Sequence, residues 1–145
     1  METAVKLTCL DCLQVNRVPR DKLGAGPVCG TCGGRLADGK VHEVDMKTLQ
    51  KALRTDDLPL VVDFWAPWCG PCRSMAPQYA QAAAALRGSA RLIKLNTDDH
   101  PAAGSMFGIR GIPLLVAFQG GREKARQAGV QPAAQIETWI RSLAA

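Results

Sequence analysis

Six cysteines in this chain of 145 residues form three pairs with the same spacing, and they are the residues best able to do chemistry. The pairs are Cys9 and Cys12, Cys29 and Cys32, and Cys69 and Cys72. Cysteines separated by two residues suit either a metal ion or a reversible disulfide. A secreted disulfide framework is the alternative, but the N-terminus has no continuous apolar run after a basic start and predicts no secretory signal. Metal binding or catalysis is therefore favoured.

The pair Cys69 and Cys72 lies in the segment Trp68-Cys69-Gly70-Pro71-Cys72, which follows an apolar strand and opens a predicted helix. Free N–H groups and the helix dipole favour an anion at a helix N-terminus, so we expect a lowered pKa for Cys69. Because the thiolate attacks in disulfide exchange, Cys69 is the candidate nucleophile, expected to be exposed, and Cys72 is the shielded thiol that resolves the mixed disulfide. An isolated pair of this spacing is as often half of a zinc site, but its place between a strand and a helix favours redox catalysis.

Asp63 interrupts an apolar strand six residues before Cys69. Burial penalises a carboxylate and raises its pKa, which suits a general base that deprotonates Cys72 through a water molecule. The alternative is a carboxylate held in a structural ion pair, and Lys94 in the next predicted strand is a candidate partner under either interpretation. The neighbouring cysteine pair favours the catalytic role.

The other four cysteines have the spacing of a tetrahedral zinc site. Cys9 and Cys12 are followed after sixteen residues by Cys29 and Cys32, and four thiolates fill the coordination shell of a structural Zn²⁺ ion. Glycines at positions 30, 33 and 34 permit tight turns whose N–H groups can point at sulfur. Two disulfides or free thiols are the alternatives, and the expected cytosolic location favours zinc.

The elements that position these residues fall into two parts. Residues 9–40 contain four cysteines, six glycines and few bulky apolar groups, so this part needs a metal or a partner to fold, and we predict a zinc-ribbon-like domain over 1–40. The domain over 41–145 alternates strands with helices. Strands are predicted over 41–44, 58–65, 90–96, 114–118 and 123–127, and helices over 45–53, 69–86, part of 98–107 and from 132 onward. This order predicts an α/β fold, a mixed sheet with helices on both faces.

Several motifs resemble thioredoxin, in the order in which they occur there. They are Asp63-Phe-Trp-Ala-Pro-Trp-Cys-Gly-Pro-Cys72, Met75-Ala-Pro77, Lys94-Leu-Asn96, Gly108-Ile-Arg-Gly-Ile-Pro113 and Gly129. The resemblance implies a thioredoxin fold with a five-stranded sheet and four helices, a cis peptide bond before Pro113, and a reducing activity. It also implies a substrate groove formed by Trp68, Gly70, Pro71, Gly111, Ile112, Pro113 and Gly129.

The four N-terminal cysteines, with Asn16-Arg-Val-Pro19 and Pro27-Val-Cys-Gly-Thr-Cys-Gly33, resemble the extension of zinc-bearing bacterial thioredoxins of the thioredoxin 2 type. The resemblance implies a cytoplasmic protein-disulfide reductase that acts on disulfide-containing proteins and in electron transport. It also implies recycling by an NADPH-dependent thioredoxin reductase.

Charge and composition argue against other classes of function. The net charge of +5 is spread over both parts of the chain, and residues 1–40 contain no aromatic residue, so nucleic-acid binding is not expected. The chain shows no apolar run that could span a membrane and no glycine-rich phosphate loop, so neither a membrane location nor a bound nicotinamide or flavin is expected. We expect a monomer. The rival interpretation is an interaction module whose ribbon binds nucleic acid or protein and whose redox pair is only a switch.

Overall fold

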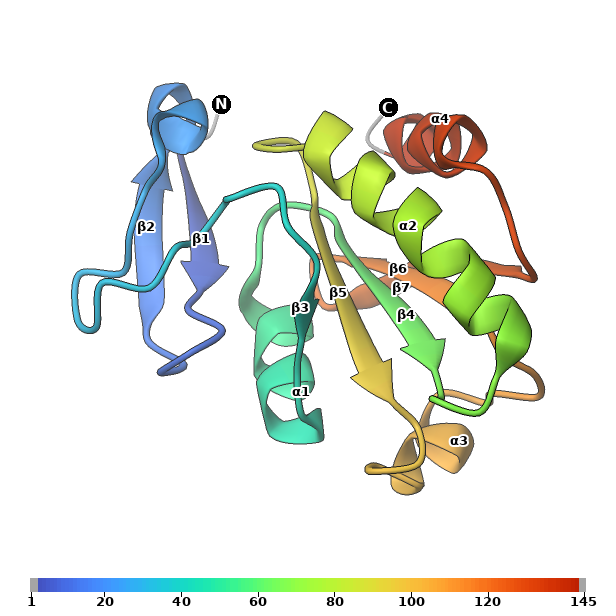
Figure 1. Cartoon of the computed structure of the whole chain (residues 1–145). Helices are drawn as coiled ribbons and strands as arrows, with labels where there is room; N and C mark the ends of the chain where they lie inside the picture. The colour runs from blue at the N-terminus through green and yellow to red at the C-terminus, as the bar shows by residue number, and fades with distance from the viewer. Residues whose placement is uncertain (1–2, 144–145) are drawn as a thin grey trace.

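The computed structural model describes residues 3–143, which form two sheets that lie apart in the molecule (Figure 1). The central sheet has five strands in the order β3-β5-β4-β6-β7. The strands are β3 (His42–Glu43), β4 (Leu60–Trp65), β5 (Arg91–Asn96), β6 (Leu114–Gln119) and β7 (Arg122–Ala128). Strands β3, β5 and β4 are parallel, and β6 and β7 run as a hairpin whose first strand is antiparallel to β4. The predicted mixed sheet is therefore confirmed.

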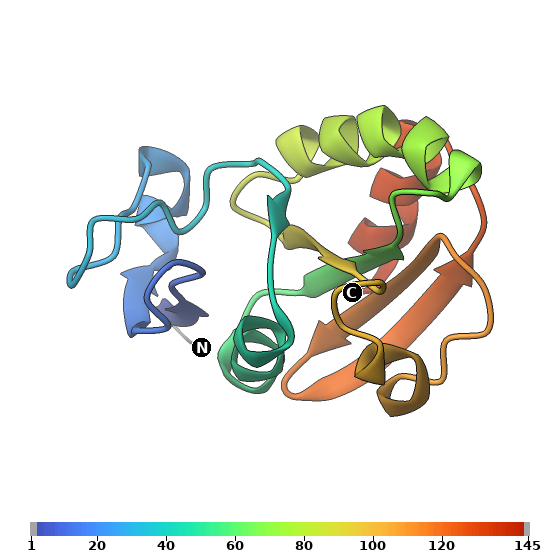
Figure 2. The ribbon, with the colours of Figure 1, turned by 60° about the horizontal axis from the view of Figure 1, so that its bottom comes forward.

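Four helices within the described residues cover the two faces of this sheet, as predicted. They are α1 (Met46–Thr55), α2 (Gly70–Ala85), α3 (Ala102–Met106) and α4 (Ala133–Leu143). Helices α2 and α4 lie on one face, while α1 and α3 lie on the other (Figures 1 and 2). Asp45 caps α1 by accepting a hydrogen bond from the N–H of Thr48 at 2.8 Å, and α2 continues through Pro77. None of the helices over 3–143 is both long and apolar enough to cross a membrane.

Alternation along β4 sends its side chains into two separate cores. Val62 and Phe64 pack in the core beneath α1 and α3, whereas Val61 packs in the core beneath α2 and α4. Because successive side chains of a strand point to opposite faces, Asp63 lies on the α2 face together with Val61. The strand thus places one carboxylate on the face of the sheet that α2 and α4 cover.

The N-terminal segment (residues 3–40) forms an antiparallel hairpin of β1 (Ala4–Thr8) and β2 (Val15–Pro19), followed by a 3₁₀ helix, η1 (Arg20–Ala25). These elements had no clear signal in the sequence, since only the alternation over residues 4–8 resembles a strand. The segment has a small core of its own, formed by Val5, Leu7, Cys9, Val18, Leu23, Cys29, Leu36 and, from the second part of the chain, Leu58. A residue of the second part of the chain therefore completes the core of the N-terminal segment.

A buried polar joint holds the N-terminal segment against the central sheet. The Arg91 guanidinium donates to the carbonyl oxygens of Thr8 at 2.8 Å and Leu36 at 3.0 Å, and it forms an ion pair with Asp56 at 2.9 Å. Asp56 in turn accepts a hydrogen bond from the N–H of Thr8 at 2.8 Å.

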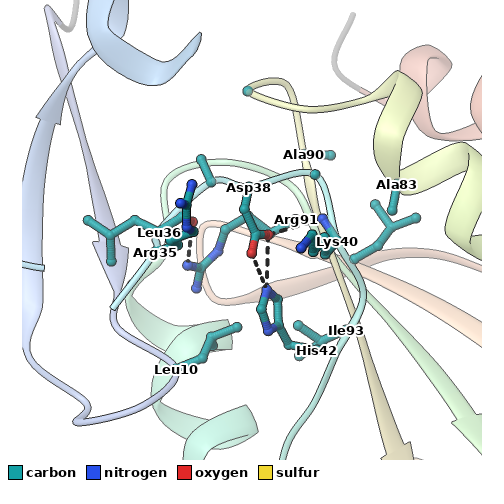
Figure 3. A pocket seen from close by; sticks show the side chains of 14 residues that line it. Leu10, Arg35, Leu36, Asp38, Lys40, His42, Ala83, Ala90, Arg91 and Ile93 are labelled. Atoms are coloured by element: carbon teal, nitrogen blue, oxygen red, sulfur yellow. Dashed lines mark hydrogen bonds and ion pairs between the residues drawn. The ribbon is translucent and has the colours of Figure 1, made fainter. Parts of the chain in front are cut away.

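The cavity beside this joint, in which Asp38 contacts His42 at 2.9 Å, has a volume of only about 20 Å³ (Figure 3). That is room for about one water molecule.

Candidate active site and four-cysteine cluster

Cys69 and Cys72 form a disulfide at the N-terminus of α2, so the structure represents the oxidised protein. Strand β4 ends at Trp65, and a short turn closed by a hydrogen bond from the Cys69 N–H to the Ala66 carbonyl at 3.1 Å leads into the helix. Cys69 is the N-cap residue, and its sulfur accepts a hydrogen bond from the N–H of Cys72 at 3.2 Å. The backbone therefore offers a donor to this sulfur, as the helix-terminus argument predicted.

The predicted exposure of Cys69 is wrong for the oxidised protein. Cys69 is 4% exposed and Cys72 is 2% exposed, so both residues are buried. The two sulfurs are bonded to each other, and Ala66 packs with them in a small cluster that Trp65 and Ile112 border. The neighbouring Trp68 is instead strongly exposed, at 67%.

The loop before β6 comes directly against the disulfide. The Ile112–Pro113 peptide bond is cis, as the resemblance implied, and the Ile112 carbonyl oxygen lies 3.8 Å from the Cys69 sulfur. The N–H of Gly129, at the end of β7, donates to the Pro113 carbonyl at 3.0 Å. Ile112, Pro113 and Gly129 are thus brought together beside Cys69, and Gly111 is exposed next to them.

Two polar side chains near the disulfide were not predicted from the sequence. Asp98, just beyond β5, accepts a hydrogen bond from the indole N–H of Trp68 at 3.1 Å. Arg73, in the first turns of α2, donates to the Pro67 carbonyl at 2.7 Å. Both are surface residues whose spacing along the chain gives no sign of these contacts, because their partners are set by the folded turn at residues 66–69.

Asp63 is buried on the α2 face, with an exposure of 3%. Burial raises the pKa of its carboxyl to about 7, while the positive charge of Lys94 lowers it. Lys94 is the register partner of Asp63 on β5, and its ammonium lies 4.8 Å from the centre of the Trp65 ring. The Oδ1 atom of Asp63 has no hydrogen-bond partner in the described part of the chain. Strand β4 therefore carries a buried carboxyl with a raised pKa on the face that α2 covers.

The other four cysteines come together at the turn that joins β1 to β2. They are Cys9, Cys12, Cys29 and Cys32. Their four sulfurs all lie within 4.8 Å of one another, with the Cys9 and Cys32 sulfurs 3.5 Å apart and the Cys12 and Cys29 sulfurs 3.6 Å apart. Disulfide-bonded sulfurs would be about 2.05 Å apart, so these cysteines are not paired as disulfides. Metal–sulfur distances near 2.3 Å in a tetrahedron give sulfur–sulfur distances of about 3.8 Å, which these separations approach.

The two halves of the cluster share one backbone pattern. The N–H of Leu13 donates to the Cys9 carbonyl at 2.9 Å, and the N–H of Gly33 donates to the Cys29 carbonyl at the same distance. Leu13 and Gly33 both have positive φ, at 71° and 79°. Leu13 is therefore held in a conformation that usually requires glycine. In the second half, the Gly34 N–H also points at the Cys32 sulfur at 3.4 Å.

The electrostatics of the cluster favour a bound cation. The Asn16 side chain and the backbone N–H groups of Cys32 and Thr31 lower the pKa of Cys29 to about 6. The N–H of Gly34 also lowers the pKa of Cys32, but the neighbouring sulfurs of Cys9 and Cys12 outweigh it and raise that pKa to about 12. Four thiolates at these distances repel one another, so a dication is needed to hold all four ionised. The residues therefore fit a zinc ion by number, donor type and spacing.

The fold, with a Cys-x-x-Cys disulfide at a helix N-terminus and a cis-proline loop against it, defines a thiol–disulfide oxidoreductase. Comparison with known proteins agrees. The family model for thioredoxin matches residues 40–142, and the model described as "Thioredoxin 2, N-terminal" matches residues 8–34. The chain belongs to the thioredoxin family and carries the N-terminal zinc ribbon domain of thioredoxin 2. We call residues 3–40 the ribbon below.

Individual relatives support this assignment over most of the chain. Thioredoxin C-3 of Corynebacterium nephridii is 34% identical over 134 residues, which cover 92% of each chain. Thioredoxin 1 of Chlorobaculum tepidum is 43% identical over 90 residues, covering 62% of this chain and 89% of the relative. Among solved structures, a mutant thioredoxin from Halobacterium salinarum superposes with a TM-score of 0.68 at 28% identity, covering 76% of this chain and 96% of that one.

Proposed function

We propose that this thioredoxin reduces disulfide bonds in proteins through the Cys69-Gly70-Pro71-Cys72 dithiol. The observation that carries the proposal is the Cys69 sulfur, which caps α2 and lies 3.8 Å from the carbonyl oxygen of Ile112 at the cis-proline loop. In the reduced protein, the Cys69 thiolate attacks one sulfur of a substrate disulfide, and the other substrate sulfur leaves as a thiolate. Cys72 then attacks Cys69, the second substrate sulfur leaves, and the dithiol has given two electrons to the substrate.

Asp63 is proposed to accept the Cys72 proton through a water molecule in the second step. Its burial on the α2 face and its raised pKa, about 7, support this role, because a base is most effective when its pKa lies near the working pH. Lys94 is proposed to adjust the Asp63 carboxyl by its charge from the neighbouring strand. Neither residue is expected to form a bond to the substrate.

The residues around Cys69 are proposed to bind an extended segment of the substrate. They are Trp68, Gly70, Pro71, Gly111, Ile112, Pro113 and Gly129. The exposure of Trp68 and of Gly111, and the convergence of Ile112, Pro113 and Gly129 beside the disulfide, support this proposal. Backbone groups of Ile112 and Gly129 would pair with the substrate backbone, and the Trp68 indole would cover its side chains.

The four-cysteine cluster is proposed to hold one structural Zn²⁺ ion. Cys9, Cys12, Cys29 and Cys32 would fill a closed tetrahedral shell, which leaves no open position for catalysis. When bound, the metal would neutralise the thiolates and contribute folding free energy to the ribbon. We place the boundary between the ribbon domain and the thioredoxin domain at residues 40 and 41. The separate matches of the two family models, over 8–34 and 40–142, support that boundary.

The oxidised dithiol must be reduced again, and we propose an NADPH-dependent thioredoxin reductase as the electron donor. The assignment to the thioredoxin family supports this partner. A monomer in the cytoplasm, with no bound nicotinamide or flavin, would fit such a cycle.

Reduction of insulin by dithiothreitol, followed by turbidity, tests the activity. The wild-type chain should accelerate precipitation, Cys69→Ser should not, and Cys72→Ser should accumulate a mixed disulfide with insulin that is visible by mass spectrometry. Ser74→Ala, at an exposed position of α2, is the control and should leave the active-site chemistry in place. If wild type and Cys69→Ser behaved alike and Cys72→Ser trapped nothing, the chain would not be a reductase and the interaction-module interpretation would lead.

A further inference from the structure

Three side chains on the α2 face are arranged so that the lysine does not neutralise the carboxylate. Asp63 and Lys94 are register partners on the parallel strands β4 and β5, so their side chains lie on the same face of the sheet. Over residues 3–143, however, no ion pair joins them, and the Lys94 ammonium lies over the ring of Trp65 at 4.8 Å. Trp65 is two residues beyond Asp63 on the same strand, so its side chain points to the same face.

We propose that Trp65 is a positioning residue, whose indole face holds the Lys94 ammonium beside Asp63 while preventing a direct ion pair. A cation is attracted to the face of an indole ring, and the attraction is stronger where water is partly excluded. Lys94 and Trp65 are both half-buried, and the indole N–H of Trp65 is buried without a hydrogen-bond partner in the described chain, so water is partly excluded from their contact. The ring is therefore fixed by packing and not by a hydrogen bond of its own.

The position of the ammonium sets the balance on which the carboxyl depends. A direct ion pair would hold Asp63 ionised and make it a poor proton acceptor, whereas loss of the positive charge would leave burial unopposed and keep it protonated. An ammonium held over the Trp65 ring lowers the Asp63 pKa only in part, so the carboxyl can both take up and release a proton. This step rests on the proposed role of Asp63 as the proton acceptor for Cys72.

The other groups that face Asp63 do not supply this balance. Tyr79 of α2 has its hydroxyl bonded to the carbonyl oxygens of Val61 at 3.0 Å and Ile93 at 2.8 Å, and both burial and the Asp63 charge keep the Tyr79 pKa well above its ordinary value. Tyr79 therefore stays neutral across the working pH range. Leu115, the register partner on β6, is apolar. Lys94 is therefore the cation that acts on the carboxyl.

The test is a titration of the Asp63 carboxyl in the oxidised full-length protein, followed by carbon NMR of the side chain. Trp65→Leu should lower the Asp63 pKa below the wild-type value, because the freed ammonium moves toward the carboxylate. Trp65→Met, which has no aromatic face but can fill apolar space, should lower it in the same direction and serves if the leucine variant does not fold. Trp65→Phe keeps a ring and should stay close to wild type. Trp139→Met, on α4, is the matched loss of a half-buried tryptophan and should leave the Asp63 pKa unchanged.

The same substitutions in a Lys94→Met background separate positioning from simple packing. If Trp65 acts through Lys94, most of the shift caused by Trp65→Leu should disappear when Lys94 is absent. An undiminished shift in that background, or no fall in the Asp63 pKa when Trp65 is replaced, would overturn the proposal. Because the titration reads the carboxyl itself, it is independent of turnover. Failure of Asp63→Asn to slow the second step would instead refute the role of Asp63 and leave the positioning result standing.

Discussion

Arg91 of β5 and Asp56, in the loop before β4, form a buried ion pair that joins the ribbon to the thioredoxin domain. Their side chains are 6% and 1% exposed, and the nearest nitrogen and oxygen are 2.9 Å apart. Each member also binds the ribbon backbone: Arg91 through the carbonyls of Thr8 and Leu36, and Asp56 through the N–H of Thr8. Thr8 directly precedes the metal-ligand candidate Cys9. If the ribbon unfolds, the buried Arg91 and Asp56 side chains therefore lose their hydrogen bonds to its backbone.

Replacing Arg91 by methionine should destabilise the whole chain by about 3–5 kcal/mol, because it leaves a buried carboxylate and two backbone carbonyls without their partner. Burial already raises the pKa of Asp56, and Arg91 is the charge that opposes this. The free energy of unfolding from urea titration measures the loss.

Arg141→Met is the matched control for this prediction. Arg141 forms an ion pair with Glu137 on α4, but its side chain is 51% exposed, so its loss should cost no more than about 0.5 kcal/mol. Equal losses in the two variants would mean that the joint is not important for stability.

Removal of the metal should unfold the ribbon before the thioredoxin domain. Cys9 and Cys29 belong to the small ribbon core. Without a cation the four thiolates take up protons, and the ion that held them together is gone. Incubation with a chelator should abolish the protection of β1 and β2 against hydrogen exchange, while β4 and β5 stay protected. The same chelator saturated with zinc beforehand should have no effect, and persistent protection of the metal-free ribbon would contradict a structural role for zinc.

The thioredoxin domain was predictable because its local signals agree with its packing. Apolar runs gave β4, β5 and β6, and Asp45 marked the start of α1. The hairpin of the ribbon was not predicted, because β2 contains Asn16, Arg17 and Pro19 and lacks a regular alternation. Its strands are held by pairing with β1 and by the joint to the second domain, which are contacts between distant residues that no local pattern reveals.

The site shows the same division. Cysteine spacing was enough to find both clusters, because a separation of two residues suits both a pair of metal ligands and a reversible disulfide. Two side-chain contacts near the site were missed, because Asp98 reaches Trp68, and Trp65 reaches Lys94, only after the strands and turns are assembled. The burial of Cys69 was also missed, since a helix N-terminus predicts a donor for the sulfur but not the packing of Ala66 and Ile112 around it.

Trp68→Ala should weaken the reduction of protein substrates more than that of small disulfides. The indole is 67% exposed and is held in place by its hydrogen bond to Asp98, so it offers contact area only to a substrate large enough to cover it. We expect a rise in KM of about tenfold for insulin, from the loss of about 1–2 kcal/mol of contact, with little change for a small aromatic disulfide. Val28→Ala, which removes an exposed apolar side chain from the ribbon, should change neither. Equal effects on both substrates would place Trp68 in the chemistry and not in recognition.

Asp63→Asn should make the protein more stable at pH 8 and slower in the second step of disulfide exchange. An aspartate has an ordinary pKa of 3.8, whereas burial raises that of folded Asp63 to about 7. Between these pH values the folded protein binds more protons than the unfolded chain, so the free energy of unfolding falls as pH rises from about 4 to about 7 and is level above. The full contribution is on the order of 4 kcal/mol, and the asparagine variant avoids it.

Urea titrations at pH 5 and pH 8 should therefore show wild type losing stability relative to Asp63→Asn, while the exposed Asp99→Asn follows wild type at both. A difference between wild type and Asp63→Asn that did not change with pH would mean that the folded protein does not bury an ionisable carboxyl at this position.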